Sequence, residues 1–155
     1  MLKMGIKEKY QELSKKHKLP PFKETDQEFE ISTIEEEEFL LREIRRKIAE
    51  KIEAYSNILH SLIHPEANLC EMYECRAFTD GEKDNIFNIY KKLMFFSRYS
   101  IETSVDENDE KTAKFISDFW KDWGDIKKVL LPTMKKVKES WLKDIDVKEE
   151  LGYMG

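Results

Sequence analysis

The sequence predicts an all-α fold, an up-and-down helical bundle of about five helices with one long central helix. Apolar residues recur at steps of three and four along most of the chain, which is the spacing of one helix face. The 155 residues include only five glycines and four prolines, so turns are few and the helices between them are long. No segment alternates polar and apolar residues for long enough to indicate a strand.

The composition indicates one helical domain. Hydrophobic residues make up 40% of the chain and charged residues 38%, which suffices for one core beneath a highly charged surface. We expect a single helical-bundle domain over residues 1–145 and a flexible C-terminal tail over residues 146–155. The charged residues are mostly Lys and Glu, which is typical of proteins from thermophiles.

The net charge and the absence of long apolar runs restrict the function. The net charge of −5 argues against a general nucleic-acid coat protein, because such proteins need a basic surface. No apolar run approaches the roughly 20 residues that span a bilayer, and the first residues lack the apolar stretch of a signal peptide. We therefore expect a cytoplasmic protein with no membrane contact, whose two cysteines stay reduced.

A short first helix is predicted by a stripe at steps of three and four, which consists of Ile6, Tyr10, Leu13 and His17. Pro20 and Pro21 should end this helix, because proline has no backbone N–H to donate. Apolar residues are sparse and irregular over residues 22–31. This stretch is therefore predicted to be an extended or single-turn connector.

The long central helix is predicted from about Thr33 to Ile63. Ser32 and Glu35 match a capping box, in which each side chain bonds the other residue's backbone N–H. An apolar stripe then repeats until Pro65, and the helix would be roughly 45 Å long. Its acidic first turn suits the positive end of the helix dipole.

Two further helix starts follow. Asn68 with Glu71 can cap a short helix, and Thr79 with Glu82 forms a second capping box. The second cap should open a long helix that ends near Val105. The spacing predicts that this helix turns the following residues inward: Ile86, Ile89 or Tyr90, Leu93, Met94, Phe96 and Ile101.

After a polar turn over residues 106–110, two helices are predicted in the remaining chain. Gly124 can end the first of them in the left-handed conformation. Pro132 should kink the last helix or mark its true start. A dense aromatic group on these helices is expected to form core, and comprises Phe115, Phe119, Trp120, Trp123 and Trp141.

One group of residues could hold zinc: His60, His64, Cys70 and Cys75. Histidines four residues apart share a helix face, and two nearby thiolates could complete a tetrahedral site. The alternative is that the histidines end a helix and the cysteines are small buried side chains. Cysteines five residues apart do not share a helix face, and the spacing differs from that of common zinc modules.

Two basic clusters could contact a nucleic-acid backbone: Arg42, Arg45 and Arg46 in the first, and Lys127, Lys128, Lys135 and Lys136 in the second. Lys and Arg supply most phosphate contacts in such interfaces. The alternative is a solvated surface, in which each arginine pairs with a glutamate three or four residues away.

The C-terminal tail carries an apolar tip that could act as a short docking peptide, formed by Leu151, Tyr153 and Met154. The motifs of enzymes are missing from the sequence: it contains no Glu-x-x-His pair of a di-iron bundle, no nucleophile elbow and no phosphate-binding glycine loop. We therefore predict a protein that is not an enzyme.

Three segments resemble the helical domain of the GINS replication subunits. They are Leu19-Pro20-Pro21-Phe22, the helical run Leu41-Arg42-Glu43-Ile44-Arg45-Arg46-Lys47-Ile48, and Phe78-Thr79-Asp80-Gly81-Glu82 at a helix start. The small β domain typical of that family has no counterpart in this sequence. The resemblance implies a nucleic-acid-associated subunit of a replication or repair assembly.

The predicted length of the central helix favours a scaffold, adaptor or small subunit that acts through protein–protein contacts. A helix of roughly 45 Å is longer than the roughly 35 Å diameter of a compact domain of this size, so a partner should cover the excess. A second copy of the chain is as plausible a partner as a foreign protein. Nucleic-acid association and zinc binding are the alternative functions.

Overall fold

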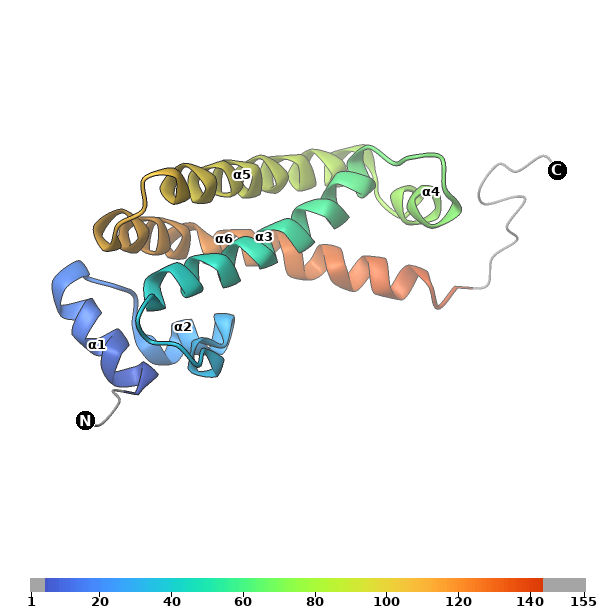
Figure 1. The fold of residues 1–155 in the computed structure, drawn as a ribbon. Coiled ribbons are helices and arrows are strands. Elements are labelled where there is room, and N and C mark those ends of the chain that lie inside the picture. The colour runs from blue at the N-terminus through green and yellow to red at the C-terminus, as the bar shows by residue number, and fades with distance from the viewer. Residues whose placement is uncertain (1–4, 144–155) are drawn as a thin grey trace. The chain divides into compact units, whose positions relative to one another are not determined.

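The computed structural model describes residues 5–143, and this part of the chain is all-α. Figure 1 shows its elements, which are α1 (Ile6–His17), α2 (Phe22–Phe29), a 3-10 turn (Ile31–Thr33), α3 (Leu40–Ile63), α4 (Leu69–Arg76), α5 (Asp80–Val105) and α6 (Asp109–Ser140). The predicted all-α helical bundle is confirmed, with six α-helices among the described residues rather than about five. No helix among them is long and apolar enough to cross a membrane.

The chain divides into two compact units. Unit 1 comprises residues 1–53 and 95–123, and unit 2 comprises residues 54–94 and 124–155. Helices α3, α5 and α6 each contribute residues to both units. The prediction of one domain over residues 1–145 stays a prediction, and the proposed tail over residues 146–155 lies outside the described residues.

The expected connector over residues 22–31 is wrong, because most of it forms helix α2. Pro21 precedes the helix, where its missing N–H is not needed. Its carbonyl accepts bonds from the backbone N–H of Thr25 at 3.1 Å and from the Thr25 hydroxyl at 2.6 Å. Thr25 and Phe29 are buried one turn apart. The helix therefore forms because its first turn is bonded and one side packs into unit 1.

The predicted start of the central helix is also wrong. Asp26 accepts a bond from the Ser32 N–H at 2.7 Å, and Ile34 has an extended backbone, so Ser32 and Glu35 do not form a capping box. The acidic run 35–38 lies outside the helix, which begins at Leu40. Helix α3 has 24 residues and is about 36 Å long. The predicted overhang disappears, and α5 and α6 are both longer than α3.

The two later caps are confirmed. Asn68 accepts from the Glu71 N–H at 2.8 Å and starts α4. The Thr79 hydroxyl accepts from the Glu82 N–H at 3.1 Å, and Glu82 accepts from the Thr79 N–H at 2.9 Å. This reciprocal pair fixes the start of α5, which ends at Val105 as predicted.

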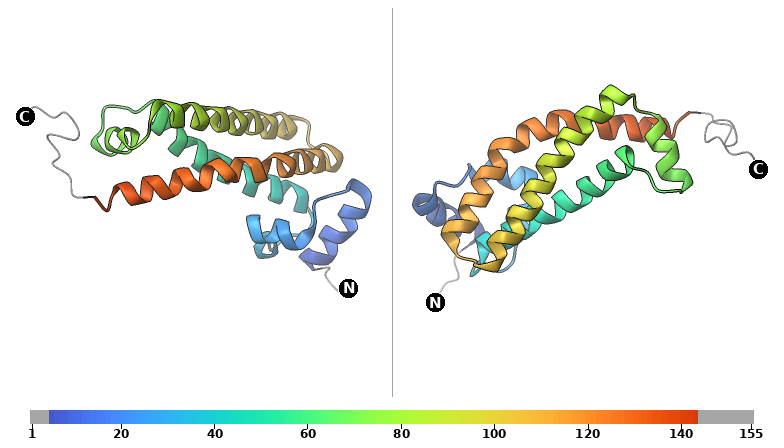
Figure 2. Two further views of the ribbon diagram at one scale, coloured as in Figure 1. Left: turned by 180° about the vertical axis from the view of Figure 1, so that it is seen from behind. Right: turned by 90° about the horizontal axis from the view of Figure 1, so that it is seen from above.

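Helix α6 runs unbroken through Gly124 and Pro132, so the predicted break at Gly124 is wrong (Figure 2). A glycine inside a helix costs only about 1 kcal/mol relative to alanine. Burial of the residues before and after Gly124 outweighs this cost, since Trp123 and Ile126 are 5% and 0% exposed. Near Pro132, the hydroxyl of buried Thr133 donates to the Val129 carbonyl at 2.7 Å.

An aromatic cluster forms much of the core of unit 1. Phe29 of α2 packs against Phe119 and Trp123 of α6, with ring centroids 5.9 and 5.8 Å away. Phe96 of α5 packs against Phe119 at 5.2 Å. The predicted aromatic core is confirmed for Phe115, Phe119 and Trp123, which are all buried.

The core of unit 2 gathers apolar residues from α3, α4, α5 and α6 and from the turn between α4 and α5. Its buried members include Leu59, Leu62, Tyr73, Phe78, Ile86, Ile89, Leu93, Ile126 and Leu130. Trp141 was expected in the core, but it lies beyond α6 and is 47% exposed. Its ring packs against Tyr73 with centroids 4.5 Å apart, and its indole N–H donates to Glu74 at 2.9 Å. It therefore covers α4 from outside.

Candidate interaction surface

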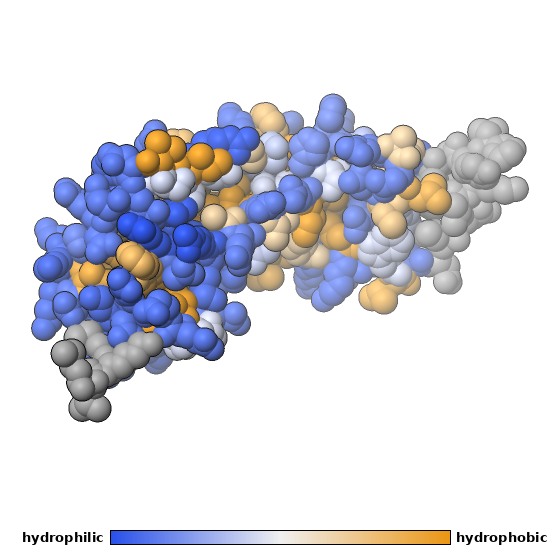
Figure 3. All heavy atoms as spheres, viewed as in Figure 1, coloured by the Kyte–Doolittle hydropathy of each residue, from blue (hydrophilic) through white to orange (hydrophobic). Residues whose placement is uncertain are grey.

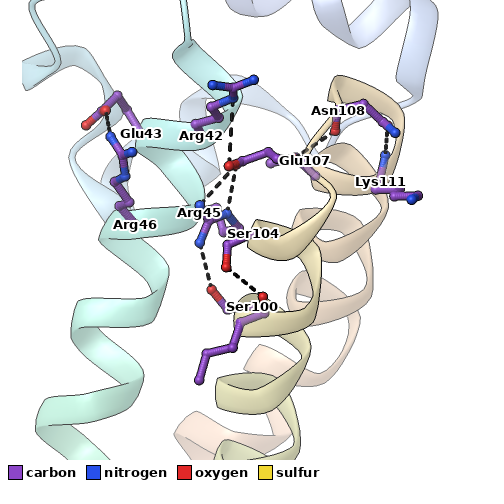
Figure 4. A network of polar contacts seen from close by, with 11 residues as sticks. Arg42, Glu43, Arg45, Arg46, Ser100, Ser104, Glu107, Asn108 and Lys111 are labelled. Atoms are coloured by element: carbon purple, nitrogen blue, oxygen red, sulfur yellow. Dashed lines mark hydrogen bonds and ion pairs between the residues drawn. The ribbon is translucent and has the colours of Figure 1, made fainter.

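A buried arginine network lies at one end of unit 1. Arg45 of α3 is 7% exposed. Its guanidinium donates to Glu107 at 3.1 and 3.0 Å and to the Ser100 hydroxyl at 3.1 Å (Figure 4). Arg42 lies 3.8 Å from the second carboxylate oxygen of Glu107. The network therefore joins α3 to the last turns of α5 and to the turn before α6.

This network includes two arginines of the predicted nucleic-acid surface. Arg45 is buried, while Arg42 pairs with Glu107 and lies over the Phe39 ring at 4.6 Å. Only Arg46 pairs as predicted with a glutamate on its own helix face, through an ion pair with Glu43 (Figure 4). Arg42 and Arg45 therefore contribute to the packing of unit 1, while Arg46 stays on the surface, with its side chain 57% exposed. The proposed nucleic-acid contact through these arginines stays a prediction.

The lysine cluster lies in unit 2, and some of its members also make contacts within the protein. Lys136 donates to both oxygens of Glu82, at 2.7 and 2.8 Å, and lies 5.1 Å from the Phe78 ring centroid. The hydrogen bond from Lys136, with the one from the Thr79 backbone, lowers the pKa of Glu82. Phe78, Glu82 and Lys136 line a surface depression beside Pro132.

The remaining lysines of the cluster differ in their surroundings. Lys128 lies 3.7 Å from Asp125, one turn earlier on α6. Lys127 is half-buried, and Lys135 is exposed. The proposed nucleic-acid contact through this cluster stays a prediction, with fewer available cations than the sequence indicated.

The structure brings together only half of the proposed zinc ligands. The rings of His60 and His64 lie 5.9 Å apart, and both side chains are exposed. Cys70 is exposed and Cys75 is buried, so the two thiols of α4 face different surroundings. Within residues 5–143, no three His, Cys, Asp or Glu side chains gather as metal ligands. A zinc site from these four residues is therefore not preformed.

The two histidines belong instead to a shallow depression of unit 2. His60 packs against Tyr90 of α5, with ring centroids 5.8 Å apart. Lys83 and Asp84 also line this depression. The predicted docking residues of the tail, Leu151, Tyr153 and Met154, lie outside the described residues.

The most prominent exposed apolar group of unit 1 lies on the C-terminal part of α5. Phe95 is 61% exposed, Ile101 54% and Val105 81%. Exposed Arg98 and Glu102 lie between them, and the spacing of three and four residues places all five on one helix face. We call these five residues the α5 outer stripe. Apolar side chains gather over this end of α5 in Figure 3.

Sequence reasoning assigned Ile101 to the core, and this prediction is wrong. The buried face of this part of α5 is formed by Phe96, Ser100 and Thr103, which are 2%, 3% and 4% exposed. Two small hydroxyl residues therefore occupy core positions while Ile101 faces outward. The sequence shows apolar residues on two opposite faces of α5, but it does not show which of the two faces is buried.

Polar contacts on neighbouring positions fix the rotation of α5. Tyr99 donates its hydroxyl to Asp118 of α6 at 2.7 Å, and Lys114 donates to the same carboxylate at 2.8 Å. Burial and the hydrogen bond to Asp118 raise the pKa of Tyr99. Burial acts to raise the pKa of Asp118, but the bonds from Lys114 and Tyr99 outweigh it and lower the pKa. The hydrogen bond between Tyr99 and Asp118 therefore keeps the stripe on the outer side of α5.

Comparison with known proteins finds no matching family model, no matching curated protein and no matching solved structure. The resemblance to GINS subunits therefore stays a resemblance of three short segments.

Proposed function

We propose that the chain is a non-enzymatic helical scaffold, adaptor or small subunit that acts through protein–protein contacts at the α5 outer stripe. The observation that supports this proposal is the exposure of Phe95, Ile101 and Val105 on one face of a helix whose other face is buried. A helix with apolar residues on opposite faces is expected to be covered on both sides. The cytoplasmic location remains part of the proposal.

The chemistry of the stripe suits a binding surface. Burial stabilises by about 25 cal/mol per Å² of apolar area, so covering three large side chains contributes several kcal/mol to association. Two charged side chains among them can set the orientation of a partner. The helix is already folded and anchored through Tyr99 and Ser100, so little ordering is needed when a partner binds.

The alternative functions have less support in the geometry. Arg45 and Lys136 are held by carboxylates, so two of the predicted phosphate contacts would have to give up internal bonds. A replication or repair subunit that binds nucleic acid therefore remains the second candidate. Zinc binding remains the third, because the cysteines do not gather with His60 and His64.

The proposal is tested by the size of the complexes that the full chain forms in the cells from which it comes. Wild-type protein and the Ile101→Glu variant are compared by denaturing gel electrophoresis after chemical crosslinking in the intact cells, so that weak complexes are also captured. The matched control is Gln11→Glu, because Gln11 is also exposed in unit 1 but lies on α1. Both substitutions add one negative charge to an exposed helix position.

We expect wild type and Gln11→Glu to migrate as a complex larger than the free chain, and Ile101→Glu to lose most of this complex. A charge placed inside an apolar contact must be desolvated without a partner, which strongly weakens association. Equal migration of all three proteins would contradict the proposal. Unchanged helical circular dichroism of each purified protein shows that the substitutions leave the fold intact.

A further inference from the structure

We propose that the α5 outer stripe binds the same stripe of a second copy of this chain, with the two α5 helices antiparallel. This inference rests on the proposed function and names the partner. It is carried by the order of apolar and charged residues in the stripe, which is self-complementary.

Four of the five residues of the stripe keep the same order of apolar and charged positions in both directions. Apolar Phe95 and Val105 lie at equal distances on either side of position 100, and so do Arg98 and Glu102. The charges at the two inner positions are opposite. A two-fold axis near position 100 therefore relates apolar to apolar and positive to negative, as a symmetric interface requires.

An antiparallel pair about this axis brings each of these four residues opposite a suitable residue of the second copy. Phe95 of one copy faces Val105 of the other, and Arg98 faces Glu102, each contact occurring twice. Ile101 lies close to the axis and packs against the second helix. A parallel pair in register would place each Arg98 opposite the other Arg98, which is repulsive. The charges therefore select the antiparallel arrangement.

The stripe is available without rearrangement of the chain. All five of its residues are exposed, while Ser100 and Tyr99 on other faces of the helix bond to Arg45 and Asp118. A self-complementary surface on a fixed helix pairs with little change in backbone conformation.

The length of the stripe sets the strength of the pair. Residues 95–105 span about 16 Å of helix, which covers less than the roughly 800 Å² per partner of stable dimers. The dimer should therefore be weak, with a dissociation constant of roughly 10 μM to 1 mM. The dissociation constant must therefore be measured over a wide range of protein concentration.

The test is sedimentation equilibrium of the purified full chain at about 10 μM to 1 mM, the range of a weak pair. Four proteins are compared: wild type, Arg98→Glu, Glu102→Arg, and the double charge swap. Each single variant places like charges opposite each other at two symmetric contacts, and the swap restores opposite charges. We expect the dissociation constant to rise roughly tenfold in each single variant and to return close to the wild-type value in the double swap.

Two results would overturn the inference. One is a wild-type chain that stays monomeric at the highest concentration. The other is a dimer with the same dissociation constant in all four proteins, which would place the contact elsewhere. If the purified chain is monomeric but Ile101→Glu still loses its complex in cells, the partner is a foreign protein. The inference then fails and the proposed function stands.

Discussion

Replacing Glu107 with alanine is expected to lower the free energy of unfolding by about 3 kcal/mol. Glu107 accepts two bonds from Arg45, at 3.1 and 3.0 Å, and their side chains are 13% and 8% exposed. Removing one member of a buried pair leaves the other charge uncompensated, which costs about 3–5 kcal/mol. Partial access of water and the remaining bond to Ser100 place the expected value at the lower end of this range.

The assay is urea unfolding monitored by circular dichroism, and the control is Glu43→Ala. Glu43 pairs with Arg46 on the surface of α3, where the Arg46 side chain is 57% exposed. Loss of this pair and of its contribution at the helix start should cost less than about 1 kcal/mol. In thermal unfolding, the Glu107→Ala variant should melt about 6–12 °C below wild type.

A second substitution distinguishes the cost of an unpaired buried charge from the cost of a lost contact. Combining Glu107→Ala with Arg45→Met removes the buried charge, so the double variant should be more stable than Glu107→Ala alone. A methionine side chain is flexible enough to occupy most of the space that the arginine leaves. The reasoning would be refuted by a loss below about 1 kcal/mol for Glu107→Ala, or by additive losses in the double variant.

Three further predictions concern a buried tyrosine, a capping glutamate and DNA binding. Tyr10→Phe should lower stability by about 1 kcal/mol at pH 7, because the buried hydroxyl donates to the Pro20 carbonyl at 2.5 Å. Burial raises the pKa of Tyr10 to about 12, so wild type should lose stability as pH rises from 10 to 12, and Tyr10→Phe should lose less in urea unfolding. The pKa of Glu82 is lowered in the folded protein, so this group contributes stability above its unfolded pKa near 4.3 and loses that contribution as pH falls through the folded pKa. The difference in melting temperature between wild type and Glu82→Gln should therefore shrink as pH falls through this range. In low-salt fluorescence titrations with DNA we expect no micromolar binding, because Arg45 and Lys136 are held internally; a salt-sensitive micromolar complex would favour the nucleic-acid alternative.

Helix periodicity and local caps could be predicted from the sequence because they depend on neighbouring residues. The bounds of α1 and the reciprocal cap between Thr79 and Glu82 are confirmed. The start of α3 was missed because a bond from the Ser32 N–H to Asp26 competes with the capping box. The predicted helix end at Gly124 is wrong, because burial of the neighbouring residues outweighs the low helix propensity of one glycine.

The candidate surface could be predicted only in part. The arginine cluster was found, but its partner Glu107 is 62 positions from Arg45 and lies in a turn, where local spacing gives no pairing signal. The same limit applies to Ile101, since a helix with two apolar faces does not reveal which one is buried. Long-range packing decides both cases.

The central claim is that the α5 outer stripe contacts another protein chain, and site-specific photo-crosslinking tests it most directly. A photo-crosslinking residue is placed at position 101 of the full chain or, as control, at position 121, which is exposed on α6. Both proteins are irradiated in the cells from which the sequence comes. We predict a covalent adduct with another chain, a second copy or a foreign protein, from position 101 and not from position 121. Irradiation that gives no adduct from position 101, or equal adducts from both positions, would contradict the claim.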